Sequence, residues 1–177
     1  MPNYVYIACS LDGFIAKPDG NLDWLLNIPN PNNDDYGFSE YMSKIDGIIM
    51  GRNTFETVLG FPEWPYQKPV FVLSNTMKTI PDIMKDKVEI VSGDLKKIIR
   101  NLHQRKINNI YVDGGKTIQS FLKEDLIDGM IITTVSKILG EGISLFGEIG
   151  IEKHFLIEKV ERLNEYMVKT YYRKEEI

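Results

Sequence analysis

Short apolar segments alternate with amphipathic helical patterns through most of this chain, and this alternation limits the folds that the chain can adopt. The apolar runs predict strands at 4–9, 47–50, 70–74, 88–91, 110–112 and 130–135. Helical periodicity predicts helices at 35–45, 53–59, 95–106 and 116–122. Strands that alternate with helices favour a mostly parallel central sheet covered on both faces, which is a three-layer α-β-α fold of the α/β class.

The end of the chain departs from that alternation. Two further runs, at 155–160 and 167–172, are expected to be strands joined near Asn164. Consecutive strands with a short connection predict an antiparallel hairpin at one edge of the sheet. The segment 27–34 is rich in Asn and Pro and the segment 61–69 contains three prolines, so both are expected to be irregular.

Length and composition bound the class of protein. The 177 residues suit one compact domain, expected to span 1–177. The single cysteine, Cys9, excludes an intramolecular disulfide and favours a reducing compartment. The start of the chain lacks the features of a signal peptide, and no apolar run approaches the roughly 20 residues needed to span a bilayer. We therefore expect a cytoplasmic protein with no membrane partner.

Charge and histidine placement exclude two further classes. The formal net charge is −4, with acids and bases mixed along the chain, which argues against a nucleic-acid partner. The two histidines, His103 and His154, lie far apart and neither has a second ligand at metal spacing, so no metal site is expected.

Two strand-to-helix junctions carry the chemistry expected of a phosphate site. In α/β sheets, ligands bind at the carboxyl ends of strands, where helix N-termini direct free N–H groups outward. At the first junction, Gly51 leaves room for a phosphate, Arg52 offers a forked cation, and Thr54 adds a hydroxyl in the first helical turn. A plain turn with a solvated arginine is the alternative for this segment.

The second junction places Gly114 and Gly115 after Asp113, at the end of a strand. The N–H groups of residues 116–118 are expected to form an anion-binding turn. A P-loop requires a glycine where Ile110 stands, so that motif is excluded. No G-x-G-x-x-G fingerprint occurs either, which argues against an ordinary Rossmann dinucleotide site.

Taken together, these junctions resemble the dihydrofolate-reductase-like superfamily, in particular the branch of the bacterial riboflavin-biosynthesis reductase domain and its stand-alone relatives. Four segments carry the resemblance: 10–16 (SLDGFIA), 50–55 (MGRNTF), 112–115 (VDGG) and 139–146 (LGEGISLF). They are similar to the signatures S-L-D-G-x-I-A, M-G-R-x-T-[FWY], Gly-Gly and L-G-E-G-I-P-L-F, in the family's order.

The resemblance implies NADPH as the cofactor. The Gly-Arg-x-Thr turn would hold its phosphates, the end of the third strand would flank the adenosine and its 2′-phosphate, and Ala8 and Ile15 would touch the nicotinamide. It also implies a cis peptide bond between Gly114 and Gly115. The expected cofactor contacts are Ala8, Ile15, Gly51, Arg52, Asn53, Thr54, Leu73, Ser74, Asn75, Ser92, Gly93, Asp113, Gly114, Gly115, Lys116, Thr117 and Ile118.

On the substrate side, the resemblance points to Asp35 as a catalytic and substrate-binding acid, and to Trp24 as the tryptophan of the loop before the helix. Asp35 is equally suited to cap that helix. Asp12 is a further substrate-side candidate, and Asp35, Asp12 or water would supply the proton. This sequence contains neither the Pro-Trp pair of the ordinary folate reductases nor the deaminase domain that often precedes the riboflavin reductase domain.

The resemblance thus implies hydride transfer from NADPH to a small heterocyclic substrate, first of the 5-amino-6-(5-phosphoribosylamino)uracil reductase type. A dihydrofolate-type pterin reductase and a non-catalytic nucleotide-binding protein on the same fold are the alternatives. Relatives of this type are commonly dimers, so a homodimer is expected. The C-terminal hairpin offers Phe155, Tyr166, Tyr171 and Tyr172 for that interface, or for the chain's own core.

Overall fold

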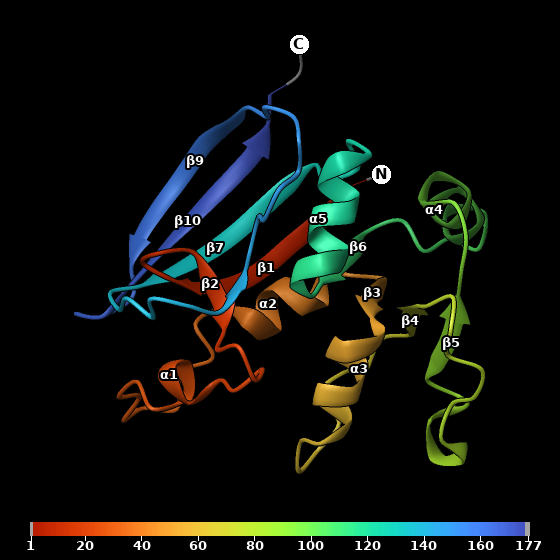
Figure 1. Ribbon diagram of the computed structural model, residues 1–177, viewed down its shortest axis with the longest axis horizontal. Coiled ribbons are helices and arrows are strands. Elements are labelled where there is room, and N and C mark those ends of the chain that lie inside the picture. The colour runs from red at the N-terminus through yellow and green to blue at the C-terminus, as the bar shows by residue number, and fades with distance from the viewer. Residues whose placement is uncertain (1, 176–177) are drawn as a thin grey trace.

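The computed structural model describes residues 2–175, and one sheet runs through all of it (Figure 1). Its strands are β1 (Asn3–Ser10), β3 (Gly47–Gly51), β4 (Val70–Leu73), β5 (Val88–Val91), β6 (Ile110–Asp113), β7 (Gly129–Val135), β9 (Phe155–Arg162) and β10 (Met167–Lys174). They lie in the order β5-β4-β3-β6-β1-β7-β10-β9. The first six pair in parallel, β10 runs antiparallel to β7, and β9 runs antiparallel to β10. The parallel sheet and its antiparallel edge are confirmed.

Helices cover both faces of this sheet. They are α1 (Asp23–Leu26), α2 (Phe38–Ser43), α3 (Arg52–Leu59), α4 (Leu95–Gln104) and α5 (Gly115–Lys123), with a 3₁₀ turn at Asp82–Met84. Successive residues of β3 face opposite sides. Ile48 packs in the cluster of α2 and α3, whereas Ile49 packs in the cluster of α4 and α5. The three-layer arrangement predicted from the sequence is therefore confirmed.

The predicted helix at 35–45 is wrong at its start. The helix begins at Phe38, because Gly37 has a left-handed φ of 83° and cannot continue a helical turn. The Asp35 carboxylate accepts hydrogen bonds from the amides of Gly37 and Ser39 at 2.8 and 3.0 Å. Asp35 therefore caps the helix from outside it, which is the alternative that the sequence left open.

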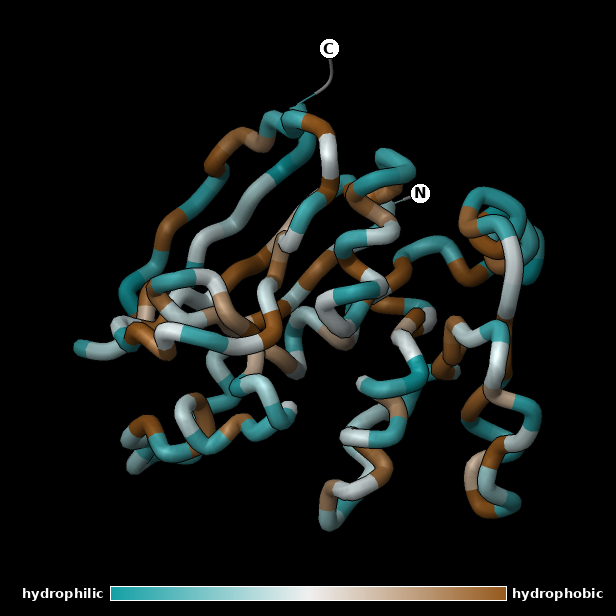
Figure 2. The backbone as a smooth tube through the Cα atoms, in the orientation of Figure 1, coloured by the Kyte–Doolittle hydropathy of each residue, from teal (hydrophilic) through white to brown (hydrophobic). Residues whose placement is uncertain are grey.

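Apolar residues gather along the central strands and the inner faces of the helices (Figure 2). They also occur on β9, the strand at the sheet's edge, where Ile157 and Val160 are more than half exposed. Within residues 2–175, no helix combines the length and the hydropathy that a membrane crossing requires.

A small second sheet lies beside the main one. It pairs β2 (Phe14–Ala16) with β8 (Ile143–Ser144) across more than 120 residues of sequence. Neither β2 nor β8 was predicted from the sequence.

Candidate functional site

The two strand-to-helix junctions lie side by side. β3 and β6 are parallel neighbours, with Met50 opposite Asp113, and α3 and α5 begin directly after them. No side chain caps the N-terminus of either helix. Free amides at two adjacent helix N-termini create a positive potential, which suits a bound anion. The two segments that the sequence assigns to the cofactor are therefore neighbours at one edge of the sheet.

The glycines at the two junctions make room for each other's threonines. A Cβ on Gly51 would lie 2.9 Å from Thr117 Oγ1, and a Cβ on Gly114 would overlap Thr54 Oγ1. Gly114 also has a φ of 89°, which L side chains rarely adopt. Both positions therefore require glycine for the two helices to begin this close together.

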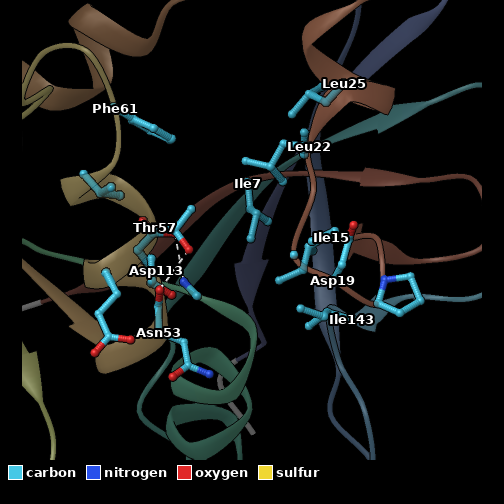
Figure 3. Close-up of a pocket in the computed structure, with 18 of the residues that line it drawn as sticks. Ile7, Ile15, Asp19, Leu22, Leu25, Asn53, Thr57, Phe61, Asp113 and Ile143 are labelled. Atoms are coloured by element: carbon cyan, nitrogen blue, oxygen red, sulfur yellow. Dashed lines mark hydrogen bonds between the residues drawn. The ribbon is translucent and has the colours of Figure 1, made fainter.

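A cleft of about 700 Å³, the main cleft, opens beside these junctions. Figure 3 shows Asn53 and Asp113 on one wall and Ile15 and Ile143 on the other, with Ile7 between the walls. The first wall comes from α3 and the end of β6, and the second from the small second sheet. The cleft thus lies at the carboxyl ends of parallel strands, where α/β proteins bind ligands.

A second cavity, of about 560 Å³, adjoins the main cleft and shares Ala8 and Leu25 with it. This side cavity lies beside the segment that leads into α2 and is lined by Asp35, Phe38 and Thr133, among others. Ala8 presents only a methyl group where the two cavities meet. Ligands in the two cavities would meet there across the Ala8 methyl group and the side chain of Leu25.

Asp113 is an acidic group on one wall of the main cleft. Its Oδ1 accepts a hydrogen bond from the amide of Gly114 at 2.8 Å, and its Oδ2 accepts one from the Tyr66 hydroxyl at 3.2 Å. Removal from water raises the pKa of Asp113, and the bonds from Gly114 and Tyr66 oppose that shift. A carboxyl group with a raised pKa in a cleft is a candidate for proton transfer.

The predicted cofactor residues divide into three groups. Six line the main cleft: Ala8, Ile15, Asn53, Thr54, Asp113 and Gly114. Another ten lie along the same edge outside it: Gly51, Arg52, Leu73, Ser74, Asn75, Ser92, Gly93, Gly115, Lys116 and Thr117. Ile118 does not fit the prediction, because its amide donates to Gly114 O within α5 and its side chain is fully buried in the core.

Two residues of the predicted phosphate site already have partners in the protein. Arg52 Nε lies 2.7 Å from Glu56 Oε1, one helical turn on, with both side chains half exposed. Ser74 Oγ accepts hydrogen bonds from the amides of Thr76 and Met77. A surface ion pair of this kind is weak, so it leaves Arg52 free to turn to an anion. No cis peptide bond occurs among the described residues, so the implied cis bond between Gly114 and Gly115 is corrected to trans.

Asp12 is not a substrate contact in this structure. Its carboxylate accepts hydrogen bonds from Ser10 Oγ at 2.6 Å and from the amides of Leu139 and Gly140 at 3.1 and 2.8 Å. These bonds, that of Ser10 above all, lower the pKa of Asp12 to about 2. The side chain ties together two loops and lines neither cavity.

Trp24 is also corrected. Its ring is 2% exposed and packs against Val135 and Met167 rather than facing either cavity. Asp35, in contrast, does line the side cavity. Hydrogen bonds from Ser39 and Gly37 lower its pKa, so it is ionised at neutral pH and is not a proton donor.

Several lining residues were not predicted. Tyr66 and Phe61 come from the proline-containing segment after α3, and Leu22 and Leu25 come from the segment around α1. Neither segment has a periodic pattern or a motif. The three prolines around a buried tyrosine, two before it and one after, were the one signal that could have marked the first of them.

Comparison with known proteins identifies the family. The family model described as the RibD C-terminal domain matches residues 4–169. The chain belongs to this family. Its fold is the dihydrofolate-reductase-like fold of RibD reductase domains, and a reductase-like role in the riboflavin pathway is supported.

Individual relatives support the same family assignment. The uncharacterized protein YwjB of Bacillus subtilis is 35% identical over 173 residues, which cover 96% of each chain. A protein from Shewanella sp. PV-4, whose description proposes a part in riboflavin biosynthesis, has a TM-score of 0.97 at 50% identity, covering 99% of this chain and all of that one. The Thermotoga maritima deaminase and 5-amino-6-(5-phosphoribosylamino)uracil reductase has a TM-score of 0.75 at 18% identity, covering 98% of this chain and 56% of that one, and this likeness concerns the fold alone.

Proposed function

We propose that this chain is an NADPH-dependent reductase that transfers a hydride to a small heterocycle of the aminopyrimidine type. The observation that carries the proposal is the contact between the main cleft and the side cavity at Ala8 and Leu25, beside two uncapped helix N-termini. One cavity offers a site for a dinucleotide and the other a site for a second ring, and the lining residues they share, Ala8 and Leu25, are both apolar. RibD family membership supports the same reaction class.

The residues at the junctions fit a dinucleotide. Gly51 and Gly114 carry no side chain that would block phosphates from the amides of α3 and α5. Arg52 and Lys116 add exposed cations in the first turns of these helices. NADPH held there would supply the hydride. Ile15 and Ala8 would lie against the nicotinamide, as the family resemblance implies.

The chain's own contribution is orientation, exclusion of water and a proton. Ala8 and Leu25 make the meeting point of the cavities apolar, and Ile7 and Ile15 continue this apolar lining into the main cleft. Burial raises the pKa of the Asp113 carboxyl group, so this group is our candidate to donate a proton to a nitrogen or oxygen of the substrate. Asp12 and Asp35, the two donors expected from the sequence, have lowered pKa values and stay ionised.

The test is a titration of the purified protein with NADPH and with NADH, followed by nicotinamide fluorescence. We expect NADPH to bind more tightly, and Arg52→Ala to weaken NADPH more than NADH. The matched control is Arg173→Ala. Arg173 pairs with Glu158 at 2.9 Å and is about as exposed as Arg52. It lies next to Gly129, at the amino end of β7, whereas the two junctions lie at the carboxyl ends of their strands.

Selective loss in Arg52→Ala alone, followed by NADPH oxidation with an aminopyrimidine, is the expected result. If neither nucleotide binds, the reductase proposal is wrong and a role without this cofactor replaces it. Equal losses for NADPH and NADH would remove Arg52 from recognition of the 2′-phosphate.

A further inference from the structure

Lys169 is a buried cation in the middle of β10. It is 4% exposed, and among residues 2–175 it forms no ion pair. Burial of a charged ammonium group without a counter-ion is unfavourable, so packing alone does not explain a lysine at this position. Ionisable groups in such environments are concentrated at functional sites.

The strand register puts Lys169 on the face of the sheet that borders the side cavity. Thr133 of β7 pairs with Ala8 of β1 on one side and with Lys169 of β10 on the other, so the three side chains share one face. Figure 1 shows these three strands side by side. Ala8 and Thr133 line the side cavity, and so does Met167, two residues before Lys169. Lys169 therefore lies next to the lining of that cavity.

The ammonium group of Lys169 lies against two further residues of the lining. It donates a hydrogen bond to the carbonyl of Tyr36 and lies 5.8 Å from the centre of the Tyr6 ring, and both tyrosines line the side cavity. The Tyr171 ring also lies at 5.8 Å. An ammonium group has three N–H donors, and among the described residues only the Tyr36 carbonyl accepts a hydrogen bond from this one.

The Tyr36 carbonyl does not depend on Lys169 alone. The Tyr6 hydroxyl donates to the same oxygen at 3.0 Å. Lys169 can therefore turn its ammonium group toward a ligand without leaving a buried carbonyl unpaired, and its flexible four-carbon stem permits that turn. An acceptor atom of a ligand in the side cavity would gain a charge-assisted hydrogen bond.

Asp35 gives the same cavity a hydrogen-bond acceptor. Hydrogen bonds from Ser39 and Gly37, together with the positive charge of Lys169, lower the pKa of Asp35, which lines the side cavity as a carboxylate. A ring bound there meets an acceptor at Asp35 and a donor at Lys169. A ring that carries both an N–H or amino group and a carbonyl oxygen satisfies the two together.

We propose that Lys169 is a specificity-determining residue of the side cavity: its ammonium group donates a hydrogen bond to a ring carbonyl oxygen of the substrate, while Asp35 accepts one from a ring N–H or amino group. This inference rests on the proposed function, because it takes the side cavity as the substrate site. A ring with an amino group in place of the carbonyl oxygen would leave the ammonium group without its acceptor, which a site built for hydrogen bonding rejects.

The experiment measures the binding of two probes by isothermal titration calorimetry on the protein saturated with NADP⁺, which fills the cofactor site without turnover. The uracil probe is 6-(ribitylamino)uracil 5′-phosphate. The diamino probe is its analogue with amino groups in place of both ring carbonyl oxygens, and the two are compared at a pH at which both rings are uncharged. We expect the wild type to bind the uracil probe about tenfold more tightly or more.

Lys169→Met tests which residue makes this choice, because it removes the ammonium group and keeps an unbranched apolar stem. We expect the variant to bind the uracil probe about tenfold more weakly and the diamino probe nearly as well as the wild type does. Lys159→Met is the matched control. Lys159 lies on the neighbouring strand β9, its Nζ is 5.3 Å from the centre of the same Tyr171 ring, and it lines neither cavity.

A purely structural role gives a different result, since release of the Tyr36 carbonyl would weaken both probes by the same factor in Lys169→Met. That result, or a wild type that binds the two probes equally or binds neither, would overturn the inference. If Lys169→Met does not fold, NMR of the Lys169 ammonium group in the wild type decides: the uracil probe should shift its signal, and equal shifts with both probes would overturn the inference. Failure of the proposed function is distinguishable, because NADP⁺ itself would then not bind.

Discussion

At the junction between β6 and α5, the lack of a Cβ on Gly114 lets α3 and α5 begin next to each other. Gly114 has a φ of 89° and faces Thr54, and Gly51 faces Thr117 in the reciprocal place. The sequence could predict that glycines at strand ends clear space, because this follows from their lack of a Cβ. It could not predict that each glycine makes room for a threonine of the other junction, because that depends on the pairing of β3 with β6.

Gly114→Ala should therefore lower the free energy of unfolding by about 2 kcal/mol or more, since left-handed strain costs about 1–3 kcal/mol and the overlap with Thr54 adds to it. Chemical denaturation measures this loss. Gly150→Ala is the control, because Gly150 has a φ of 76° and nothing within 4 Å of a Cβ. Thr54→Ala should recover part of the loss in Gly114→Ala. Equal losses in Gly114→Ala and Gly150→Ala would show that the overlap costs nothing.

Asp113 was predicted as a cofactor contact, whereas its hydrogen bond from Tyr66 and its raised pKa assign it a proton-transfer role in our proposal. The sequence could not predict this because Tyr66 lies in an irregular segment. The raised pKa of Asp113 also makes the free energy of unfolding depend on pH. An acid with a raised pKa in the folded state lowers stability as pH rises above its unfolded pKa, which is near 3.9.

Asp113→Asn removes that linkage. The variant's free energy of unfolding, relative to wild type, should rise as pH increases above about 4, because the unfolded acid ionises there while burial keeps the pKa of the folded Asp113 higher. With a substrate in hand, the same variant should lower kcat by about 10² to 10⁴, the usual contribution of a general acid. Denaturation at several pH values gives the first readout, with Asp86→Asn, at an exposed position outside both cavities, as the reference. A difference that does not vary with pH would refute the raised pKa.

At the scale of elements, the sequence predicted best where a pattern is long and local. The strand at 88–91 is found at Val88–Val91, and the helix from 95 begins at Leu95 with Asp94 Oδ1 accepting the Lys97 amide. The two-residue β8 was missed because it exists only through its pairing with β2. α1 has four residues and no side-chain cap at its N-terminus, so it has no sequence signature either.

The loop between β1 and β2 is held to the loop before β8 by Asp12. In Asp12→Ala, the amides of Leu139 and Gly140 should exchange with solvent about tenfold faster or more, because each loses a charge-assisted hydrogen bond. Amide hydrogen exchange measured by NMR checks this. Asp19→Ala is the control, since Asp19 accepts only the amide of Asn21 in its own turn.

The expected protection also has a defined pH range. The pKa of Asp12 is lowered to about 2, so its bonds to the two amides should be retained at neutral pH and lost as pH falls from about 4 toward 2. Unchanged exchange at Leu139 and Gly140 in the variant would mean that backbone pairing alone, such as that of Leu11 N with Lys137 O, holds these loops together.

At the scale of the whole molecule, three of the four aromatic residues expected at a dimer interface turn inward. Phe155 and Tyr172 pack against the protein's own core, and the Tyr171 hydroxyl donates to Glu161 at 2.6 Å, whereas Tyr166 is 40% exposed. The other exposed apolar side chains of the hairpin are Leu156, Ile157 and Val160 on β9 and Val168 on β10. Periodicity identified the hairpin, but which of its side chains face outward depends on the register shift at Tyr171 and Tyr172.

β9 is an edge strand of eight residues, and one side of its backbone has no neighbouring strand in the sheet order. An exposed apolar edge of this kind promotes pairing with another chain unless it is covered. We propose that a second copy covers it, in a two-fold symmetric dimer in which the same surface of each chain meets. Light scattering at micromolar concentration should then give twice the mass of one chain.

The double variant Ile157→Lys/Val160→Lys should give the monomer mass, because it places four like charges across the two-fold interface. Ile83→Lys is the matched control, since Ile83 is 86% exposed in the 3₁₀ turn near the opposite edge strand, β5, and should leave the mass unchanged. The double variant should also keep its affinity for NADPH, because β9 contributes no residue to the main cleft or the side cavity. A monomeric wild-type protein would remove the dimer, and a dimeric double variant would place its interface on another face of the molecule.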